Sequence, residues 1–299
     1  MRCAKACSAC AKDRWPEGCA VNPFEYRRPT DVPQAVAWLR DDPDAKLLAG
    51  GQSLLAAMKL RFAAPSLLID LQDLPELTAL EEQSGRLWIG AMCSHARVAS
   101  SSLVQLLAPM LARLAHGIGD QQVRNRGTVG GSISNADPAA CWPAGLIALQ
   151  ATICTDRRDI PADDFFGGLF TTALEPDEIV RGVRFPAAQQ ACYIKFEQPA
   201  SRFALTGVAL AKTATGVRVA VTGLGYGICR WEAAEHALSA RFSPEALQGL
   251  QLDEALASGD IHATAAYRVH LAAVLTRRVV QQILRPSTLG TATTTASTS

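Results

Sequence analysis

Residues 47–61 read LLAGGQSLLAAMKLR, and this stretch decides the fold prediction. The apolar run Leu47–Ala49 predicts a buried strand, residues 50–53 a sharp glycine-rich turn, and the residues from Ser53 or Leu54 to about Arg61 a helix. The first amides of a helix have no partner within it, and together with the helix dipole they attract anions. The stretch therefore predicts an anion site between a strand and a helix.

A second glycine-rich segment, TVGGS at Thr128–Ser132, follows the sequence QVRNRG that ends at Gly127. We predict a second turn here, in which Gly130 and Gly131 let the backbone approach a ligand where a Cβ would collide. Two such segments suit a dinucleotide pyrophosphate that backbone amides grip from both sides. Either segment taken alone is equally consistent with an ordinary tight turn.

Length and composition indicate a globular protein. The 299 residues are 48% hydrophobic and 19% charged, which predicts two or three compact units. Lys and Arg number 29 and Asp and Glu 28, so the formal charge of +1 gives no reason to expect nucleic acid as a partner. No apolar run approaches the roughly 18 residues of a membrane span, and the charged N-terminus does not resemble a secretory signal. We expect a cytoplasmic protein, with a peripheral position at the inner face of the membrane as the alternative.

Four of the 9 cysteines, Cys3, Cys7, Cys10 and Cys19, lie in a leader of residues 1–21. Their spacing could hold an iron-sulfur cluster or zinc, but an added leader without metal is the favoured interpretation, because nothing beside it resembles a cluster-binding fold. An odd number of cysteines argues against a disulfide framework. The scattered cysteines are interpreted as small buried hydrophobic residues: Cys93, Cys141, Cys154, Cys192 and Cys229.

The pattern predicts alternating elements up to about residue 186. Thr30 or Asp31 can cap a short helix that ends before Pro43. The strand at 47–49 and the run LLIDL at 67–71 flank the helix after the first glycine turn, which suggests parallel pairing. A strand at 86–92, one amphipathic helix at about 102–116, a helix that Asp137 caps with Pro138 in its first turn, and a strand at 152–154 follow.

From residue 178 onward, short alternating runs predict antiparallel strands. The runs are EIVRGVRF, YIKFE, ALTGVALAK and VRVAVTGLG. We place a domain boundary near residues 186–190 and expect helices at about 231–241, 244–250 and 261–284. The Thr- and Ser-rich tail at 287–299 is predicted to be disordered.

Common catalytic and nucleotide motifs are absent from the sequence. There is no GxxxxGK[ST] loop, the nearest approach to GxGxxG at Gly117 fails at its third glycine, and neither HExxH nor GxSxG occurs. The five histidines have no metal-ligand spacing and are interpreted as surface or satisfied core residues. We therefore predict no metal site in the main body and no catalytic side chain, which leaves binding of a large anionic ligand.

Five stretches together resemble the FAD-binding medium subunit of molybdenum hydroxylases, most closely the aerobic carbon monoxide dehydrogenase type. They are LLAGGQSLLAAMKLR, LLIDL, IGAMCSHARV, GIGDQQVRNRGTVGGSISNADPAA and DIHATAAYRVHLAAVLTRRVV. The resemblance runs from about Asn22 to Leu284. It implies an α+β fold of the vanillyl-alcohol oxidase class, in which two subdomains at 22–187 enclose FAD and a domain of antiparallel strands and helices at 188–286 covers it.

The resemblance also implies a set of FAD-binding residues. The first segment would hold the pyrophosphate, and the second would complete the cradle and reach the ribityl chain. Lys195 matches a lysine near the flavin, and Tyr193 an aromatic position that could shield the ring. Many relatives carry an aspartate where this chain has Cys141, and Asp137 is the residue expected to compensate for it. Arg202 replaces a residue that is often small or acidic in relatives. The complete predicted set is Leu47, Leu48, Ala49, Gly50, Gly51, Gln52, Ser53, Leu54, Thr128, Val129, Gly130, Gly131, Ser132, Asp137, Cys141, Tyr193 and Lys195.

The function implied by the resemblance is electron transfer through FAD. Iron-sulfur clusters of a small subunit would pass electrons from a molybdenum-cofactor large subunit to this chain, which would reduce an external acceptor such as a quinone. The expected assembly is a dimer of heterotrimers. Carbon monoxide is the favoured substrate of the complex, and purines, aldehydes, nicotinate and aromatic thioesters stay open, because another polypeptide selects the substrate. A second hypothesis, a nucleotide-binding scaffold without electron transfer, rests on Cys141 alone.

Overall fold

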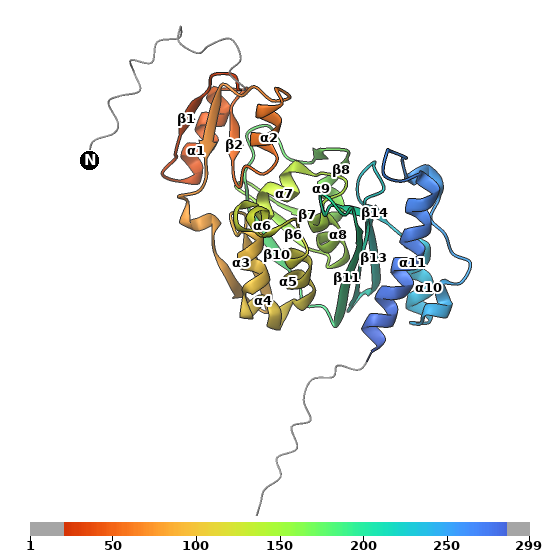
Figure 1. Cartoon of the computed structure of the whole chain (residues 1–299). Helices are drawn as coiled ribbons and strands as arrows, with labels where there is room; N and C mark the ends of the chain where they lie inside the picture. Colours follow the sequence, from red (N-terminus) through yellow and green to blue (C-terminus); the bar gives the residue numbers. More distant parts are fainter. Residues whose placement is uncertain (1–20, 286–299) are drawn as a thin grey trace, which may run out of the picture.

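The computed structural model describes residues 21–285, whose strands form three main sheets and one two-stranded ribbon (Figure 1). The cysteines predicted to lie in a leader and the tail at 287–299 are outside the described residues. The N-terminal, middle and C-terminal sheets follow one another along the chain, and helices lie between and beside them. The predicted α+β class is confirmed.

The N-terminal sheet is parallel, with the strand order β1-β3-β2. Its first helix begins as predicted, because the Asp31 side chain accepts a hydrogen bond from the Gln34 amide. The helix after the first glycine turn ends at Lys59, two residues before the predicted end, and Arg61 adopts a positive φ of 60°. The elements are β1 (Glu25–Arg27), α1 (Val32–Asp41), β2 (Lys46–Leu48), α2 (Leu54–Lys59), β3 (Leu67–Asp70) and the 3-10 turn η1 (Pro75–Leu77).

The middle sheet is antiparallel and has the order β4-β5-β10-β6-β7. Its central strand comes from EIVRGVRF, so this run lies in the middle sheet and not with the three runs that follow it in sequence. The strands are β4 (Leu80–Gln83), β5 (Arg86–Gly90), β6 (Thr152–Thr155), β7 (Asp159–Pro161) and β10 (Val180–Phe185), and the ribbon after the short helix α9 (Ala162–Phe165) consists of β8 (Phe166–Gly168) and β9 (Thr171–Thr172).

Six helices lie between β5 and β6, and three of them correct the sequence prediction. The single helix predicted at 102–116 is two helices, because the chain bends at Ala108 and Pro109 starts the second one. The helix predicted to be capped by Asp137 begins only at Cys141, with Ala140 at its N-cap. The six are α3 (His95–Ser100), α4 (Ser102–Leu107), α5 (Pro109–His116), α6 (Gln121–Arg126), α7 (Val129–Asn135) and α8 (Cys141–Ala148).

The C-terminal sheet is antiparallel in the order β11-β12-β13-β14, as the alternating runs predicted for its three long strands. The helix predicted at 244–250 is a 3-10 turn, and the last helix begins at Ala265 and not at Ile261, because Thr264 caps it. The elements are β11 (Gln190–Glu197), β12 (Ala204–Thr213), β13 (Gly216–Thr222), β14 (Cys229–Arg230), α10 (Glu232–Ala240), η2 (Pro244–Leu247), η3 (Glu254–Leu256) and α11 (Ala265–Leu284).

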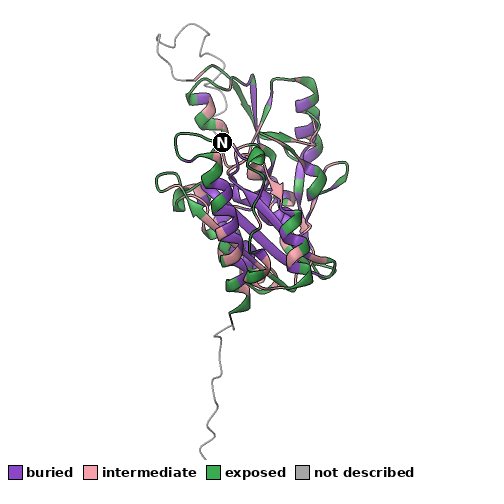
Figure 2. Cartoon of the chain, turned by 90° about the vertical axis from the view of Figure 1, so that its right-hand side faces the viewer, coloured by how far each residue is buried: buried purple, intermediate pink, exposed green. Residues whose placement is uncertain are grey.

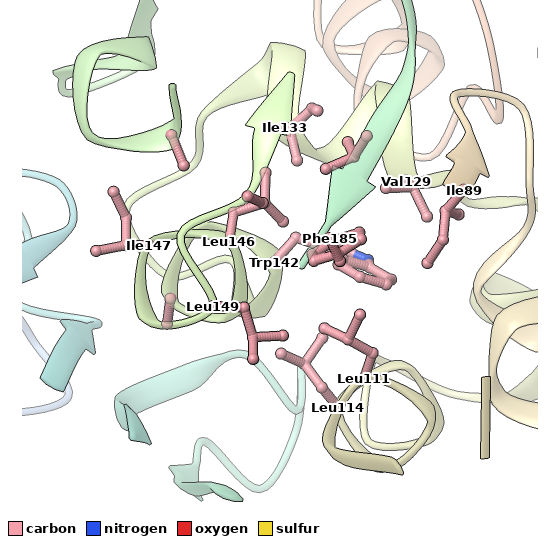
Figure 3. Packing of buried hydrophobic residues seen from close by; sticks show 14 of the residues in the cluster. Ile89, Leu111, Leu114, Val129, Ile133, Trp142, Leu146, Ile147, Leu149 and Phe185 are labelled. Atoms are coloured by element: carbon pink, nitrogen blue, oxygen red, sulfur yellow. The ribbon is translucent and has the colours of Figure 1, made fainter. Parts of the chain in front are cut away.

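The largest hydrophobic core joins the middle sheet to the C-terminal sheet through α5 and α8. Trp142 and Phe185 are among its fully buried side chains and lie close to Leu111 and Leu114 (Figure 3). Figure 2 shows buried strands and helix faces at the centre of the molecule, with exposed loops around them. A helix that is apolar on every side, such as α8, fits this position between two sheets.

Candidate FAD site

The first glycine segment, residues 49–53, connects β2 to α2 and presents backbone amides without acceptors. A Cβ on Gly50 would stand 2.2 Å from the Arg126 carbonyl oxygen, and Gly51 has a φ of 71°, so both positions require glycine. In the part of the chain that the structure describes, no group accepts a hydrogen bond from the amides of Gly50, Gly51, Gln52 or Ser53. These four neighbouring donors form a candidate anion site.

The second glycine segment corrects the prediction of a turn with free amides, because residues 129–132 are the first turn of α7. Thr128 caps this helix and accepts a hydrogen bond from the Gly131 amide at 3.1 Å. The other three amides also have acceptors: Val129 N–H donates to Cys93 O, Gly130 N–H to Ala91 O and Ser132 N–H to Thr128 O. This segment therefore offers its Ser132 hydroxyl to a ligand, not a row of amides.

Gly130 also has a packing role that the sequence did not predict. A Cβ at this position would lie 2.6 Å from the Ala91 Cβ and 2.8 Å from the Ala91 carbonyl oxygen. The glycine therefore lets the start of α7 pack on the residue that follows β5, while its backbone also lines the cleft, so its predicted approach to a ligand stays a prediction. Gly131 is less crowded, since its Cβ would lie 2.9 Å from Thr128 Oγ1 and 3.4 Å from the Ala49 Cβ.

The two glycine segments nevertheless meet in space and border one cleft of about 480 Å³. The backbone of Gly50 contacts Arg126 and Gly127, which directly precede the second segment. The predicted residues that line the cleft are Leu47, Ala49, Gly50, Gly51, Gln52, Ser53, Leu54, Thr128, Gly130, Gly131, Ser132, Asp137 and Cys141. Leu48, Val129, Tyr193 and Lys195 do not line it; Val129 is fully buried in the core.

Lys195 lies outside the cleft and joins three parts of the chain. Its Nζ donates to Gly117 O at 2.7 Å and to Arg202 O, and it lies 3.6 Å from a Glu197 carboxylate oxygen. Arg202 has a φ of 59° and lines the cleft, so the lysine holds a strained turn at the edge of the site. We conclude that Lys195 stabilises the turn between β11 and β12, which forms part of the cleft wall.

Cys141 lines the cleft, and its thiol interacts with the hydroxyl of the partly buried Tyr193, which lies behind it and outside the lining. Burial raises the pKa of the Cys141 thiol, which the nearby Lys195 charge opposes, and burial together with the adjacent thiol raises the pKa of Tyr193 well above its usual value. Both groups are therefore uncharged at neutral pH. Asp137, the residue expected to compensate for the missing aspartate, lines the cleft; burial raises its pKa, while a hydrogen bond from the Ala139 amide opposes this.

The sequence analysis missed several lining residues that lie far apart along the chain. His95 lies at the start of α3, and Ser201 and Phe203 come from the turn between β11 and β12. No spacing rule could have identified them, since only the tertiary fold brings them together. The remaining unpredicted lining residues are Lys46, Leu71, Ala91, Met92, Ile118, Gly119, Val123, Gly127, Ser134, Asn135, Ala139, Ala140, Ile179, Val180 and Arg202.

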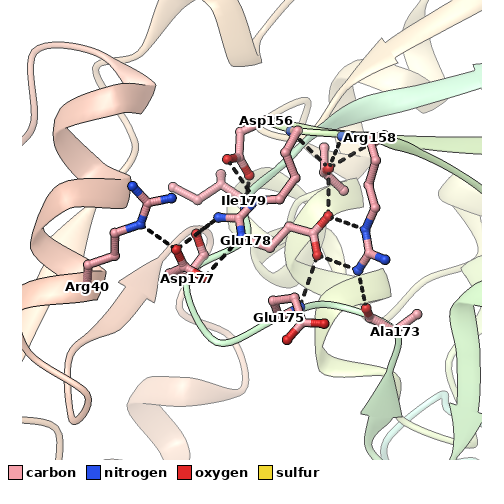
Figure 4. A network of polar contacts seen from close by, with 10 residues as sticks. Arg40, Asp156, Arg158, Ala173, Glu175, Asp177, Glu178 and Ile179 are labelled. Carbon is pink, nitrogen blue, oxygen red and sulfur yellow. Dashed lines mark hydrogen bonds and ion pairs between the residues drawn. The ribbon is translucent and has the colours of Figure 1, made fainter.

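An ion-pair network fixes the wall that Ile179 and Val180 contribute (Figure 4). Buried Glu178 pairs with Arg158 at 2.7 Å, and this hydrogen-bonded partner lowers the pKa of Glu178 to about 2. Asp177 accepts a hydrogen bond from Arg40 of α1 at 2.6 Å, so the network also links the N-terminal helix to the strand that lines the cleft.

Within residues 21–285 no group of His, Cys, Asp or Glu side chains could hold a metal ion, and no helix is long and apolar enough to cross a membrane. The five scattered cysteines are free thiols, four of them buried and Cys229 partly exposed. The cleft itself suits a dinucleotide, because four unpartnered amides lie beside an apolar and hydroxyl-bearing wall.

Comparison with known proteins identifies the family. A family model described as "FAD binding domain in molybdopterin dehydrogenase" matches residues 22–188. The chain belongs to the FAD-binding subunits of molybdenum hydroxylases. This FAD subunit is 38% identical to the carbon monoxide dehydrogenase medium chain of Hydrogenophaga pseudoflava, over 86% of this chain and 96% of the relative.

Two further relatives support this assignment. The nicotine 6-hydroxylase medium subunit of Paenarthrobacter nicotinovorans is 36% identical to the FAD subunit over 86% of this chain and 96% of that one. The solved structure of carbon monoxide dehydrogenase from Hydrogenophaga pseudoflava superimposes with a TM-score of 0.81 at 37% identity, over 88% of this chain and 98% of that one. The chain is thus an oxidoreductase subunit, and its cofactor is FAD.

Proposed function

We propose that this FAD subunit accepts electrons from iron-sulfur clusters of a partner subunit and passes them to an external acceptor. The observation that carries the proposal is the cleft in which two glycine segments meet beside four amides without acceptors. Bound FAD supplies the chemistry, since a flavin accepts electrons one at a time and donates them singly or in pairs. The side chains of the cleft would bind and orient the cofactor, and none is assigned as an acid or base.

The residues of the cleft would divide this work. The amides of residues 50–53 would hold the pyrophosphate, and the hydroxyls of Ser132 and Ser134 would hydrogen-bond the polar chain of the cofactor. Cys141, with Tyr193 behind it, would give the cleft an uncharged, weakly polar part of its wall. Lys195 would act indirectly, by holding the Arg202 turn against the cleft.

We further propose a complex of the carbon monoxide dehydrogenase type, with a molybdenum-cofactor large subunit, an iron-sulfur small subunit and two copies of each chain. The sequence similarity to a carbon monoxide dehydrogenase medium chain supports this choice, and the similarity to a nicotine 6-hydroxylase subunit, at 36% against 38% identity, supports an N-heterocycle as the alternative substrate. A cytoplasmic location, or a peripheral one at the inner face of the membrane, belongs to the same proposal.

Two experiments test this function. The purified chain is titrated with FAD, and its flavin absorption spectrum is recorded; failure to bind FAD contradicts the proposal. The native complex is then purified through a tagged FAD subunit and assayed with a dye acceptor against carbon monoxide, nicotine, purines and aldehydes. Flavin reduction by one of these substrates supports electron transfer, and a flavin that stays oxidised while the molybdenum centre is reduced contradicts it.

A further inference from the structure

His95 is a buried histidine with one nitrogen committed to the core. Its side chain is 4% exposed, and the Trp142 indole Nε1–H donates to His95 Nδ1 at 3.1 Å. An indole nitrogen can only donate, so Nδ1 must be the acceptor and the imidazole proton must lie on Nε2. The fully buried Trp142 therefore fixes both the orientation and the tautomer of the ring.

The other nitrogen, Nε2, lies where the two glycine segments meet. A Cβ on Gly127 would stand 2.9 Å from this atom, and Gly127 is in turn in contact with Gly50. The His95 ring lines the cleft, and in the described part of the chain Nε2–H has no hydrogen-bond acceptor. The residue as a whole is more than nine-tenths buried, but Nε2 is reached from the cleft, so water accepts its hydrogen bond there until a ligand oxygen takes the place of that water.

The ring is also kept neutral. Burial lowers the pKa of His95 to about 4, and the nearby Arg124 guanidinium lowers it further. Arg124 itself donates to Ile118 O and Gly119 O and to the Gln121 side chain. His95 therefore supplies a hydrogen-bond donor where the two glycine segments meet, and it adds no positive charge there.

We propose that His95 is a further FAD-binding residue, whose Nε2–H donates to a pyrophosphate oxygen at the junction of the two glycine segments. The inference rests on the proposed cofactor site and adds a side-chain donor to its backbone amides. A neutral donor fixed by Trp142 gives orientation without a strong Coulomb attraction, so it would restrict where the pyrophosphate lies. The residue is assigned to binding and not to catalysis.

Two substitutions separate this role from a purely structural one. His95→Asn keeps an acceptor near the Nδ1 position for Trp142 but removes the Nε2 donor, whereas His95→Gln places an amide nitrogen near Nε2 and removes the acceptor. The dissociation constants of FAD and of ADP are measured by titration of the flavin-free chain, and thermal unfolding is followed for each variant. ADP carries the pyrophosphate without the flavin and therefore locates the effect.

We expect His95→Asn to weaken FAD and ADP binding by about tenfold, since loss of a hydrogen bond to a charged group costs about that factor or more. His95→Gln should keep affinity within about threefold and lose more thermal stability, because the Trp142 N–H is left unpaired. Wild-type affinity in His95→Asn, or unchanged ADP affinity, overturns the inference. A wild-type chain that binds FAD in that case leaves the proposed function intact, whereas a wild-type chain that binds none contradicts both.

A measurement on the unaltered chain applies even where a variant does not fold. In a ¹⁵N-labelled flavin-free chain, the imidazole spectrum should show His95 with its proton on Nε2, and addition of FAD should move that proton resonance downfield. The Trp142→Phe variant, which removes the indole donor, assigns the signal. An Nε2 proton that does not move when FAD binds overturns the inference.

Discussion

The two glycine segments have similar sequences but differ in what they offer a ligand. Residues 50–53 leave four amides without acceptors in the described chain, whereas the amides at 129–132 all donate within the protein. The first segment links a strand to a short helix whose N-cap, Ser53, makes no capping bond, and the second is the capped start of α7 packed on Ala91. A glycine pair therefore shows that the backbone is crowded, but not whether a ligand or the protein itself is the neighbour.

The largest effect is expected from Gly50→Ala. The added Cβ would lie 2.2 Å from a backbone carbonyl oxygen that cannot move away as a flexible side chain could, so the two segments should separate. We expect a loss of about 3 kcal/mol or more in unfolding free energy and at least a hundredfold loss in FAD affinity. Urea unfolding and FAD titration measure both quantities. Gly131→Ala, with milder contacts, is the matched control, and equal effects in the two variants would contradict the assignment.

Gly130→Ala should separate stability from binding. Its Cβ would collide with Ala91, so we expect a loss of about 2 kcal/mol in unfolding free energy. Because this contact faces the protein, the variant that remains folded should bind FAD within about threefold of the wild type. A large loss of affinity in a folded variant would show that Gly130 faces the cofactor after all.

As the pH falls, the free energy of unfolding should decrease first because of His95. The ion-paired carboxylates of the protein contribute only at lower pH. The folded-state pKa of about 4 lies below the ordinary value of 6.5, so the unfolded chain binds the proton first and stability falls as the pH drops from about 6.5 toward 4. Between about pH 7 and 5 we expect a loss of about 2 kcal/mol. Urea unfolding at several pH values checks this against His95→Asn, which should lack the loss. An identical pH dependence in both chains would refute the prediction.

The smallest effects concern the two helix caps. Thr128→Ala removes the bond to the Gly131 amide and should cost about 1 kcal/mol in unfolding free energy. Ser53→Ala removes no capping bond, so stability should change by less than about 0.5 kcal/mol, whereas FAD affinity should fall about fivefold if the hydroxyl binds phosphate. Thermal unfolding and FAD titration of both variants test this contrast, which a stability loss in Ser53→Ala would break.

Local patterns predicted much of the fold. Alternation and glycine position identified β2, β3 and the long strands of the C-terminal sheet, because burial on one or two faces imposes those periods directly. The break at Pro109 was missed because the apolar spacing continues through it, and Asp137 was wrongly assigned as a cap because its side chain bonds Ala139 in a turn before α8. The domain division at 187 and 188 stays a prediction.

The site was predictable only in part, for a physical reason. The glycine segments carry a local signal, so most of their residues were found to line the cleft. His95, Ser201 and Phe203 have no such local signal in the sequence. Each is a single residue in a surface that distant parts of the chain form together. Two amides of the second segment, those of Val129 and Gly130, donate to Cys93 and Ala91, and no pattern within TVGGS reveals these acceptors.

Residues of β2, of β10 and of the turn after β11 line the cleft, so elements of all three sheets border it. A ligand that binds only when these parts are assembled stabilises the assembled state by mass action, by about 2.7 kcal/mol when its free concentration is a hundred times its dissociation constant. Bound FAD would therefore stabilise the folded subunit in addition to the electron transfer proposed for it. Cellular flavin supply would then govern how long the newly made subunit survives proteolysis, apart from any turnover it supports.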